Sequence, residues 1–291
     1  MTTLAPPSRL DPHTIAEDLL EARARTLLLV APLTDTELRT QHDPLMSPIL
    51  WDLGHIAHFE ELWLTRNLDG PIEFVEMPGL YNPFEHPRSA RGALPLPAFD
   101  RARAVMDEIR ARVLARLEQA DFGSANPLLA GGYVYRMVLQ HEYQHNETIL
   151  QTLQLKQGRP YTPYARVDLP GAPSAGAADG MVRFPGGVVQ IGTDDRSAAY
   201  DNERPRHAVE VKPFRIDVNP VTNADYLVFI SAGGYATREY WSEAGWRWLA
   251  ESGASAPKYW EYRDGSWFTR VMDRVGPVDP SHPVCHVCWY E

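Results

Sequence analysis

The sequence has few cysteines and an excess of acidic over basic residues, and it lacks long apolar runs. Its two cysteines, Cys285 and Cys288, lie near the C-terminal end, so we expect no disulfide framework of the secreted type. Lysine and arginine number 28 against 38 acidic residues, a net charge of −10. This balance argues against nucleic acid or an anionic membrane surface as a partner. No stretch approaches the ~20 apolar residues of a membrane helix and no signal peptide is evident, which predicts a soluble, cytoplasmic protein.

The length of 291 residues predicts about two domains. From Asp11 to about residue 157, apolar residues recur at steps of three and four, as on one face of a helix. Helix start and stop signals divide this region into four helical stretches, with Asp11-Pro12 opening the first and Gly131-Gly132 preceding the fourth. The pattern predicts a four-helix bundle over residues 1–163.

The pattern changes after the fourth helix. Residues 164–180 are rich in proline, glycine and alanine, which is typical of a linker. From 181 to 291, short β-branched runs separated by turn residues, with a short helix near NADYLVFISAG, predict a loop-rich α+β domain. The C-x2-C pair near the end has no second pair and no thioredoxin-like context, so we expect two ordinary buried cysteines.

Two histidines lie four residues apart in the fourth predicted helix, within the string HEYQH. His141 and His145 therefore share one helix face, and both imidazoles can contact one metal ion. A mononuclear site needs at least one further ligand, and the second predicted helix offers His55 or, one turn along, His58. Three neutral imidazoles leave coordination positions open, which is typical of a catalytic metal site.

The same string satisfies the HExxH motif of zinc metallopeptidases, in which Glu142 would be the general base. The elaborated motif requires glycine and histidine where this chain has Thr148 and Gln151. The form with a distant glutamate ligand requires a following helix, whereas a proline-rich segment without Glu or His extends to Glu203. The missing ligand argues against a peptidase. A zinc ion that only holds the bundle together is a further alternative.

A second polar cluster, HPRSARG, lies in the irregular stretch between the second and third predicted helices. Arg88 and Arg91 could each form a bidentate pair with a carboxylate of a ligand. The alternative is an exposed pair that contacts the protein's own acidic side chains. The residues alone leave both interpretations open.

Several long stretches together resemble one enzyme family. WDLGHIAHFEELWL, YNPFEHPRSARGALPLP and HEYQHNETILQTLQ are similar to the DinB-like bundle of the sulfoxide synthases (hercynine oxygenases) of ergothioneine biosynthesis. The stretch from FPGGVVQIG to NPVTNADY, with GWRWL and HPVCHVCWYE, resembles their second domain. The resemblance covers nearly the whole chain. It implies a multi-domain protein in which a DinB-like four-helix bundle precedes an α+β domain of the formylglycine-generating-enzyme, C-type-lectin-like type.

The resemblance also implies an activity. The family uses non-haem iron(II) and O2 to join the sulfur of γ-glutamylcysteine to the imidazole of hercynine (Nα-trimethylhistidine), giving a sulfoxide. Its iron-binding histidines correspond to His55, His141 and His145. Its hercynine-contacting glutamine corresponds to Gln144, and the arginines that hold the carboxylates of γ-glutamylcysteine correspond to Arg88 and Arg91.

One departure from the family concerns the C-terminal end. The family's second domain continues past the segment that resembles WYE, and its later part supplies a tyrosine proton donor. We therefore expect an incomplete second domain and a catalytic acid beyond Glu291. Relatives that use cysteine, a selenosugar or unmethylated histidine stay open as alternatives, as does a DinB-like thiol S-transferase with a divalent metal. The oligomeric state is not predicted.

Overall fold

The protein divides into two compact units. A computed structural model describes residues 11–68, 79–164, 180–196 and 199–291. The first unit contains residues 1–165 and 191–207, and the second contains residues 166–190 and 208–291. The predicted linker lies almost wholly outside the described residues. In the part of the chain that is described, no helix has the length and apolar character needed to cross a membrane.

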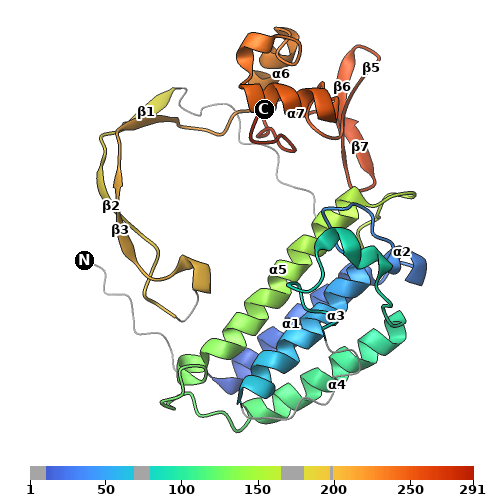
Figure 1. Cartoon of the computed structure of the whole chain (residues 1–291), viewed down its shortest axis with the longest axis vertical. Helices are drawn as coiled ribbons and strands as arrows, with labels where there is room; N and C mark the ends of the chain where they lie inside the picture. Colours follow the sequence, from blue (N-terminus) through green and yellow to red (C-terminus); the bar gives the residue numbers. More distant parts are fainter. Residues whose placement is uncertain (1–10, 69–78, 165–179, 197–198) are drawn as a thin grey trace. The chain divides into compact units, whose positions relative to one another are not determined.

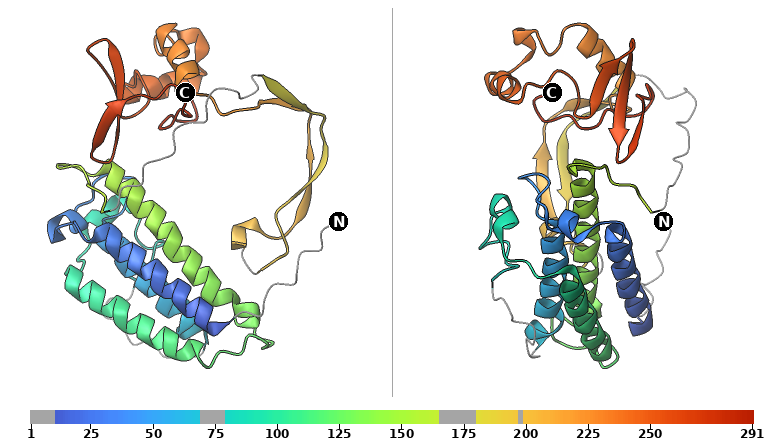
Figure 2. Two further views of the ribbon diagram at one scale, coloured as in Figure 1. Left: turned by 180° about the vertical axis from the view of Figure 1, so that it is seen from behind. Right: turned by 90° about the vertical axis from the view of Figure 1, so that its right-hand side faces the viewer.

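Four long helices lie side by side in the first unit and form the predicted bundle (Figures 1 and 2). They are α1 (Pro12–Val30), α3 (Ile49–Leu64), α4 (Phe99–Leu117) and α5 (Tyr133–Leu155). Helix α3 packs against α4 and α5, while α1 packs against α5 and, less extensively, α4. The shorter elements of this unit are α2 (Asp35–Arg39), η1 (Arg66–Leu68), η2 (Arg88–Ala93), η3 (Ala130–Gly132) and η4 (Asp201–Glu203).

The helices form where apolar spacing and end signals agree. The side chain of Asp11 accepts the backbone N–H of His13, which caps α1. Helix α5 follows Gly131 and Gly132, whose φ angles of 63° and 68° are left-handed and favour glycine. The apolar stripe of α4 is fully buried: Ala102, Met106, Ile109, Val113 and Leu117. The four-helix prediction for this half of the chain is therefore confirmed.

Residues 191–207 belong to the first unit through contacts near the start of α5. Arg204 Nη2 donates to the hydroxyl of Tyr133 at 2.7 Å. The guanidinium carbons of Arg196 and Arg204 lie 4.2 and 5.1 Å from the centre of the same ring. Arg196 also donates to the carbonyl of Pro127 at 3.0 Å. These contacts fix the segment against the N-terminal end of α5.

The rest of the chain contains short strands and two helices, as the α+β prediction requires. Strand β1 (Met181–Phe184) pairs with β4 (Phe214–Asp217) in antiparallel register, and β2 (Gly187–Ile191) pairs with β3 (His207–Val211). An antiparallel sheet contains β5 (Trp260–Arg263), β6 (Ser266–Val271) and β7 (Arg274–Pro277). The helical elements are α6 (Asn223–Ser231), η5 (Arg238–Tyr240) and α7 (Glu243–Ser252).

The prediction that both cysteines are buried is wrong. Cys285 is exposed and Cys288 is partly exposed, and both thiols are free. Both cysteines lie in the irregular segment that follows β7. This segment belongs to no helix or strand whose packing would bury the side chains. The Cys285 thiol lies 3.6 Å from the carbonyl oxygen of Pro283.

Candidate metal centre

Three imidazoles from two helices converge inside the bundle. His55 lies on α3, and His141 and His145 lie one turn apart on α5. One potential ligand atom from each of the three lies within 4.8 Å of the others. The ring centres are separated by 5.1 Å for His55 and His141, 5.0 Å for His55 and His145, and 4.6 Å for the α5 pair. The spacing of four and the packing of α3 on α5 thus produce one cluster.

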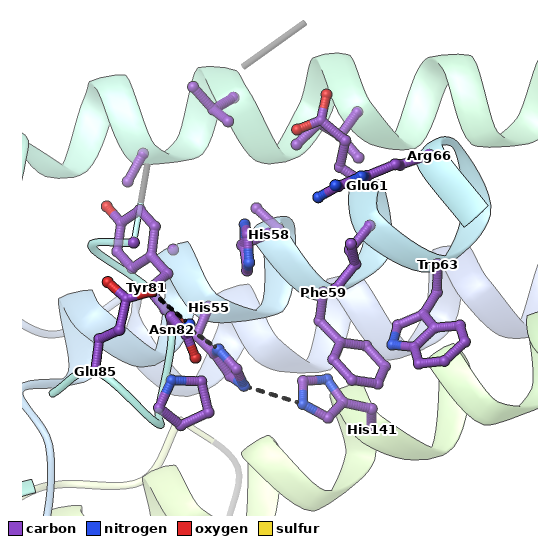
Figure 3. Close-up of a pocket in the computed structure, with 18 of the residues that line it drawn as sticks. His55, His58, Phe59, Glu61, Trp63, Arg66, Tyr81, Asn82, Glu85 and His141 are labelled. Carbon is purple, nitrogen blue, oxygen red and sulfur yellow. Dashed lines mark hydrogen bonds between the residues drawn. The ribbon is translucent and has the colours of Figure 1, made fainter. Parts of the chain in front are cut away.

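Hydrogen bonding determines which nitrogen of His55 faces the cluster. Its Nδ1 lies 2.8 Å from the carbonyl oxygen of Tyr81. A carbonyl only accepts, so Nδ1 carries the proton and Nε2 keeps its lone pair. This Nε2 lies 3.3 Å from Nε2 of His141, and Figure 3 shows the two rings pointing toward each other. The geometry therefore directs the free nitrogen of His55 into the cluster.

Burial keeps the imidazoles of His55 and His141 uncharged at neutral pH. Burial, followed by the repulsion of His145, lowers the pKa of His55 to about 3. The same two causes, with His55 in addition, lower the pKa of His141 to about 2. A neutral imidazole offers a lone pair to a metal, whereas an imidazolium does not. The chemistry of this donor set fits a divalent metal ion, and three such ligands suit iron and zinc alike.

Aromatic rings surround the cluster. Phe59 stacks on His141 with ring centres 3.7 Å apart, and Trp51 stacks on His55 at 4.8 Å. A cavity of about 780 Å³ adjoins the cluster and reaches both of these histidines. Its other walls come from α3, α4 and the segment after residue 79, including Phe59, Trp63 and Tyr81 (Figure 3). Cavities of this size accommodate small molecules.

His58, the alternative third ligand, does not join the cluster. Among the described residues, the group of potential metal ligands contains His55 with the α5 pair. His58 instead lines the cavity, where burial lowers its pKa (Figure 3). It lies three residues after His55 on α3, and Figure 3 shows its ring apart from the rings of His55 and His141.

The carboxylate of Glu142 belongs to a buried ion-pair network and is not part of the histidine cluster among the described residues. Its carboxylate is buried and forms ion pairs with Arg23 (2.8 Å) and Arg110 (2.7 Å). Burial raises the pKa of Glu142, but the attraction of the two guanidiniums is stronger and holds it below its usual range. Adjacent residues of a helix point about 100° apart, which explains the separation from His141. A general base for a peptidase would have to face the metal, so this geometry contradicts that alternative.

The structure places the two arginines in different environments. Arg88 is exposed, and its Nη1 donates to the carbonyl of Leu45 at 3.1 Å. Arg91 is buried; it donates to the carbonyl of His86 and the hydroxyl of Ser47, and its guanidinium carbon lies 3.6 Å from the centre of the Trp51 ring.

The positive charge of Arg91 is close enough to the cluster to help lower the pKa of His55, although burial, His145 and His58 lower it more. Gln144 lies on α5 directly before His145 and is exposed.

Sequence reasoning missed Asp52, a buried acid beside the cluster. Its Oδ1 lies 3.3 Å from Nδ1 of His145. The signal was available: Asp52 precedes His55 by three residues, so the two share a helix face. An acidic residue in the first turn of a helix ordinarily indicates only a stabilised helix end.

Comparisons with known proteins identify both halves of the chain. The DinB superfamily matches residues 18–149, and the sulfatase-modifying factor enzyme 1-like domain matches residues 167–291. The chain is 43% identical over 297 residues to a hercynine oxygenase of Mycolicibacterium thermoresistibile, covering 100% of this chain and 63% of that protein. It is 41% identical over 285 residues to a hercynine oxygenase of Mycolicibacterium smegmatis, covering 96% of this chain and 64% of that protein.

A more distant relative matches part of the chain. A formylglycine-generating enzyme of Thermomonospora curvata is 34% identical over 145 residues, which cover 42% of this chain and 44% of that enzyme. The chain spans a little under two thirds of the length of the two hercynine oxygenases. The chain is thus similar over its whole length to these hercynine oxygenases, and a region that matches the DinB superfamily precedes one that matches the sulfatase-modifying factor enzyme 1-like domain.

Proposed function

We propose that this protein is an iron(II)- and O2-dependent enzyme of ergothioneine biosynthesis that joins hercynine to γ-glutamylcysteine and releases a sulfoxide. The observation that carries the proposal is the convergence of three imidazoles, His55, His141 and His145, in a chain homologous to hercynine oxygenases over its whole length. Iron(II) bound by these residues would supply the redox chemistry with O2.

The proposed reaction balances with O2 as the only oxidant. A C–H bond of the hercynine ring and the S–H bond of the thiol break, and a C–S bond and an S–O bond form. O2 accepts all four electrons: one oxygen atom enters the sulfoxide and the other leaves as water with the two hydrogens. Holding both substrates beside one metal ion converts their encounter into an oriented reaction within one site.

We assign the carboxylates of γ-glutamylcysteine to Arg88 and Arg91, and contact with hercynine to Gln144. A thiol with two carboxylates complements two guanidiniums, which favours γ-glutamylcysteine over cysteine. In the described part of the chain Arg88 donates only through Nη1, so its Nε and Nη2 are available to a ligand. Arg91 adds positive charge near the cluster although its own donors partly serve Ser47 and His86.

The arginine assignment predicts a change specific to one substrate. Arg88→Ala should raise KM for γ-glutamylcysteine about 10- to 100-fold, the loss expected for a hydrogen bond between charged groups, while KM for hercynine stays unchanged. Arg103→Ala removes another exposed arginine, which pairs with Asp107 on α4, and serves as the matched control. Equal effects on both substrates, or equal effects of both variants, would contradict the assignment.

The function is tested by loading the protein anaerobically with Fe(II) and adding O2 with hercynine plus γ-glutamylcysteine or cysteine. We expect O2 uptake only when both substrates are present, and a product with the mass of both substrates plus O2 minus water. Thiol transfer without O2 would favour the thiol S-transferase. Bound metal without either reaction would favour a structural site.

A further inference from the structure

Asp52 has a buried carboxylate, and one of its two oxygens forms no hydrogen bond with the described residues. Its residue is 1% exposed, and its Oδ2 lies buried without a hydrogen-bond partner among the described residues. Its Oδ1 lies 3.3 Å from Nδ1 of His145, across the interface between α3 and α5. A buried carboxylate is costly unless cations or hydrogen-bond donors compensate it. A cation or a hydrogen-bond donor among the neighbours of Asp52 should therefore offset the cost of burying its charge.

Two groups are available for that role. One is the guanidinium of Arg91, whose pKa is lowered by burial, an effect that the attraction of Asp52 opposes. The other is the ring of His145, whose Nδ1 is buried, has no hydrogen-bond partner among the described residues and lies 3.3 Å from Oδ1 of Asp52. A carboxylate accepts hydrogen bonds, so the ring nitrogen that faces it must carry the proton. Nε2 of His145 is then left with its lone pair.

The arrangement repeats the one at His55. There the carbonyl of Tyr81 accepts Nδ1–H and leaves Nε2 free. Metal-binding histidines generally donate their second ring N–H to a carboxylate or a carbonyl, which fixes the orientation of the ring and makes the ligand more basic. In each of these two imidazoles, Nδ1 thus lies close to an oxygen atom that can accept its proton.

We propose that Asp52 is a positioning residue for the metal centre, which accepts Nδ1–H of His145 and directs its Nε2 toward the metal. The inference rests on the proposed metal centre and adds a residue that acts through a ligand. The negative charge of Asp52 would also offset part of the charge of a divalent ion in a buried site. Because Asp52 lies three residues before His55 on α3, one helix both supplies a ligand and orients another.

A simpler role for Asp52 would be stabilisation of the first turn of α3, where a negative charge is favourable. This role requires no particular tautomer of His145 and no effect on metal affinity beyond that of folding. The two roles therefore differ in measurable quantities.

The first test uses the metal-free wild-type protein with 15N-labelled histidine. Long-range 1H–15N correlation spectra distinguish the two neutral tautomers, and His145→Gln identifies the signals of that residue. We expect the proton of His145 on Nδ1. A proton on Nε2 would overturn the proposal, and this result does not depend on metal binding or activity.

The second test compares metal affinity. Asp52→Asn and Asp52→Ala should weaken Co(II) binding, measured by competition with a chelator, by about 10- to 100-fold. Glu61→Gln, a buried acid on the same helix that pairs with Arg112 at 3.7 Å, should leave Co(II) affinity unchanged. Unfolding curves establish that each variant is folded.

Wild-type affinity in both folded Asp52 variants would overturn the proposal. Failure of the wild-type protein to bind Co(II) or Fe(II) would instead contradict the proposed metal centre, and the tautomer measurement would still decide whether Asp52 accepts the proton of His145.

Discussion

Removing one charge from the buried ion-pair network of the bundle should strongly destabilise the bundle. The network joins all four long helices through Arg23, Glu60, Arg110 and Glu142. Arg23 contacts the two acids at 2.7 and 2.8 Å, and Arg110 contacts them at 2.5 and 2.7 Å. Each side chain is at most 6% exposed, and the two positive charges balance the two negative charges.

Glu142→Gln leaves two buried guanidiniums with one carboxylate. Glu142 accepts hydrogen bonds from Arg23, Arg110 and the hydroxyl of Thr26, and an amide NH2 cannot replace an acceptor oxygen toward a guanidinium. Breaking one partner of a buried ion pair typically costs about 3–5 kcal/mol. A domain has about 5–15 kcal/mol of stability in total, so a substantial part of it should be lost.

The assay is urea unfolding of the full chain followed by circular dichroism at 222 nm, where the long helices dominate the signal. Asp107→Asn, which breaks an exposed pair with Arg103 on α4, is the control and should change the midpoint little. A loss below about 1 kcal/mol for Glu142→Gln would refute the reasoning, because it would equal the contribution of a surface pair. Loss of metal binding in the folded variant would place Glu142 at the metal after all.

Three further predictions concern the ligands, their support and acid stability. His141→Ala should abolish stoichiometric Fe(II) binding, measured by metal analysis, while the helical circular dichroism signal is retained; full iron occupancy would contradict the ligand assignment. Gly54→Ala should weaken metal binding, measured by chelator competition, because the new Cβ would clash with the ring of Tyr81. The carbonyl of Tyr81 orients the ligand His55, so a shift of Tyr81 should disturb the site. Wild-type affinity would show that the Tyr81 ring can move without disturbing His55. Glu37 has a pKa lowered from 4.5 to about 2, chiefly by its hydrogen bond to Lys156, so its contribution to stability is complete above pH 4.5 and is lost as the pH falls toward 2. The stability difference between the wild type and Glu37→Gln, from urea unfolding, should therefore shrink over that range, and a constant difference would contradict the pairing.

Local patterns in the sequence predicted the helices well. The buried stripe of α4 and the glycine pair before α5 are signals within one element, and the structure contains both. The spacing of His141 and His145 likewise placed two imidazoles on one helix face. Such features depend only on residue spacing within one helix, and this spacing can be read from the sequence.

Contacts between different helices could not be predicted from local sequence patterns. The place of His55 beside the α5 pair depends on the packing of α3 against α5, and only the family resemblance indicated it. Arg23 and Arg110 were missed because charged side chains ordinarily indicate a solvent-exposed face, whereas here they compensate buried acids on two other helices. Cys285 was misjudged because burial of a cysteine depends on what covers its segment.

The most direct test of the metal centre is X-ray absorption at the iron edge of the anaerobic Fe(II) protein, before and after addition of γ-glutamylcysteine. We predict imidazole scattering that is reduced in His55→Ala, His141→Ala and His145→Ala, and a sulfur neighbour of iron that appears only with the thiol. Iron bound without imidazole scattering, or a spectrum that the thiol leaves unchanged, would contradict the proposal that these three histidines hold iron for oxidative C–S bond formation.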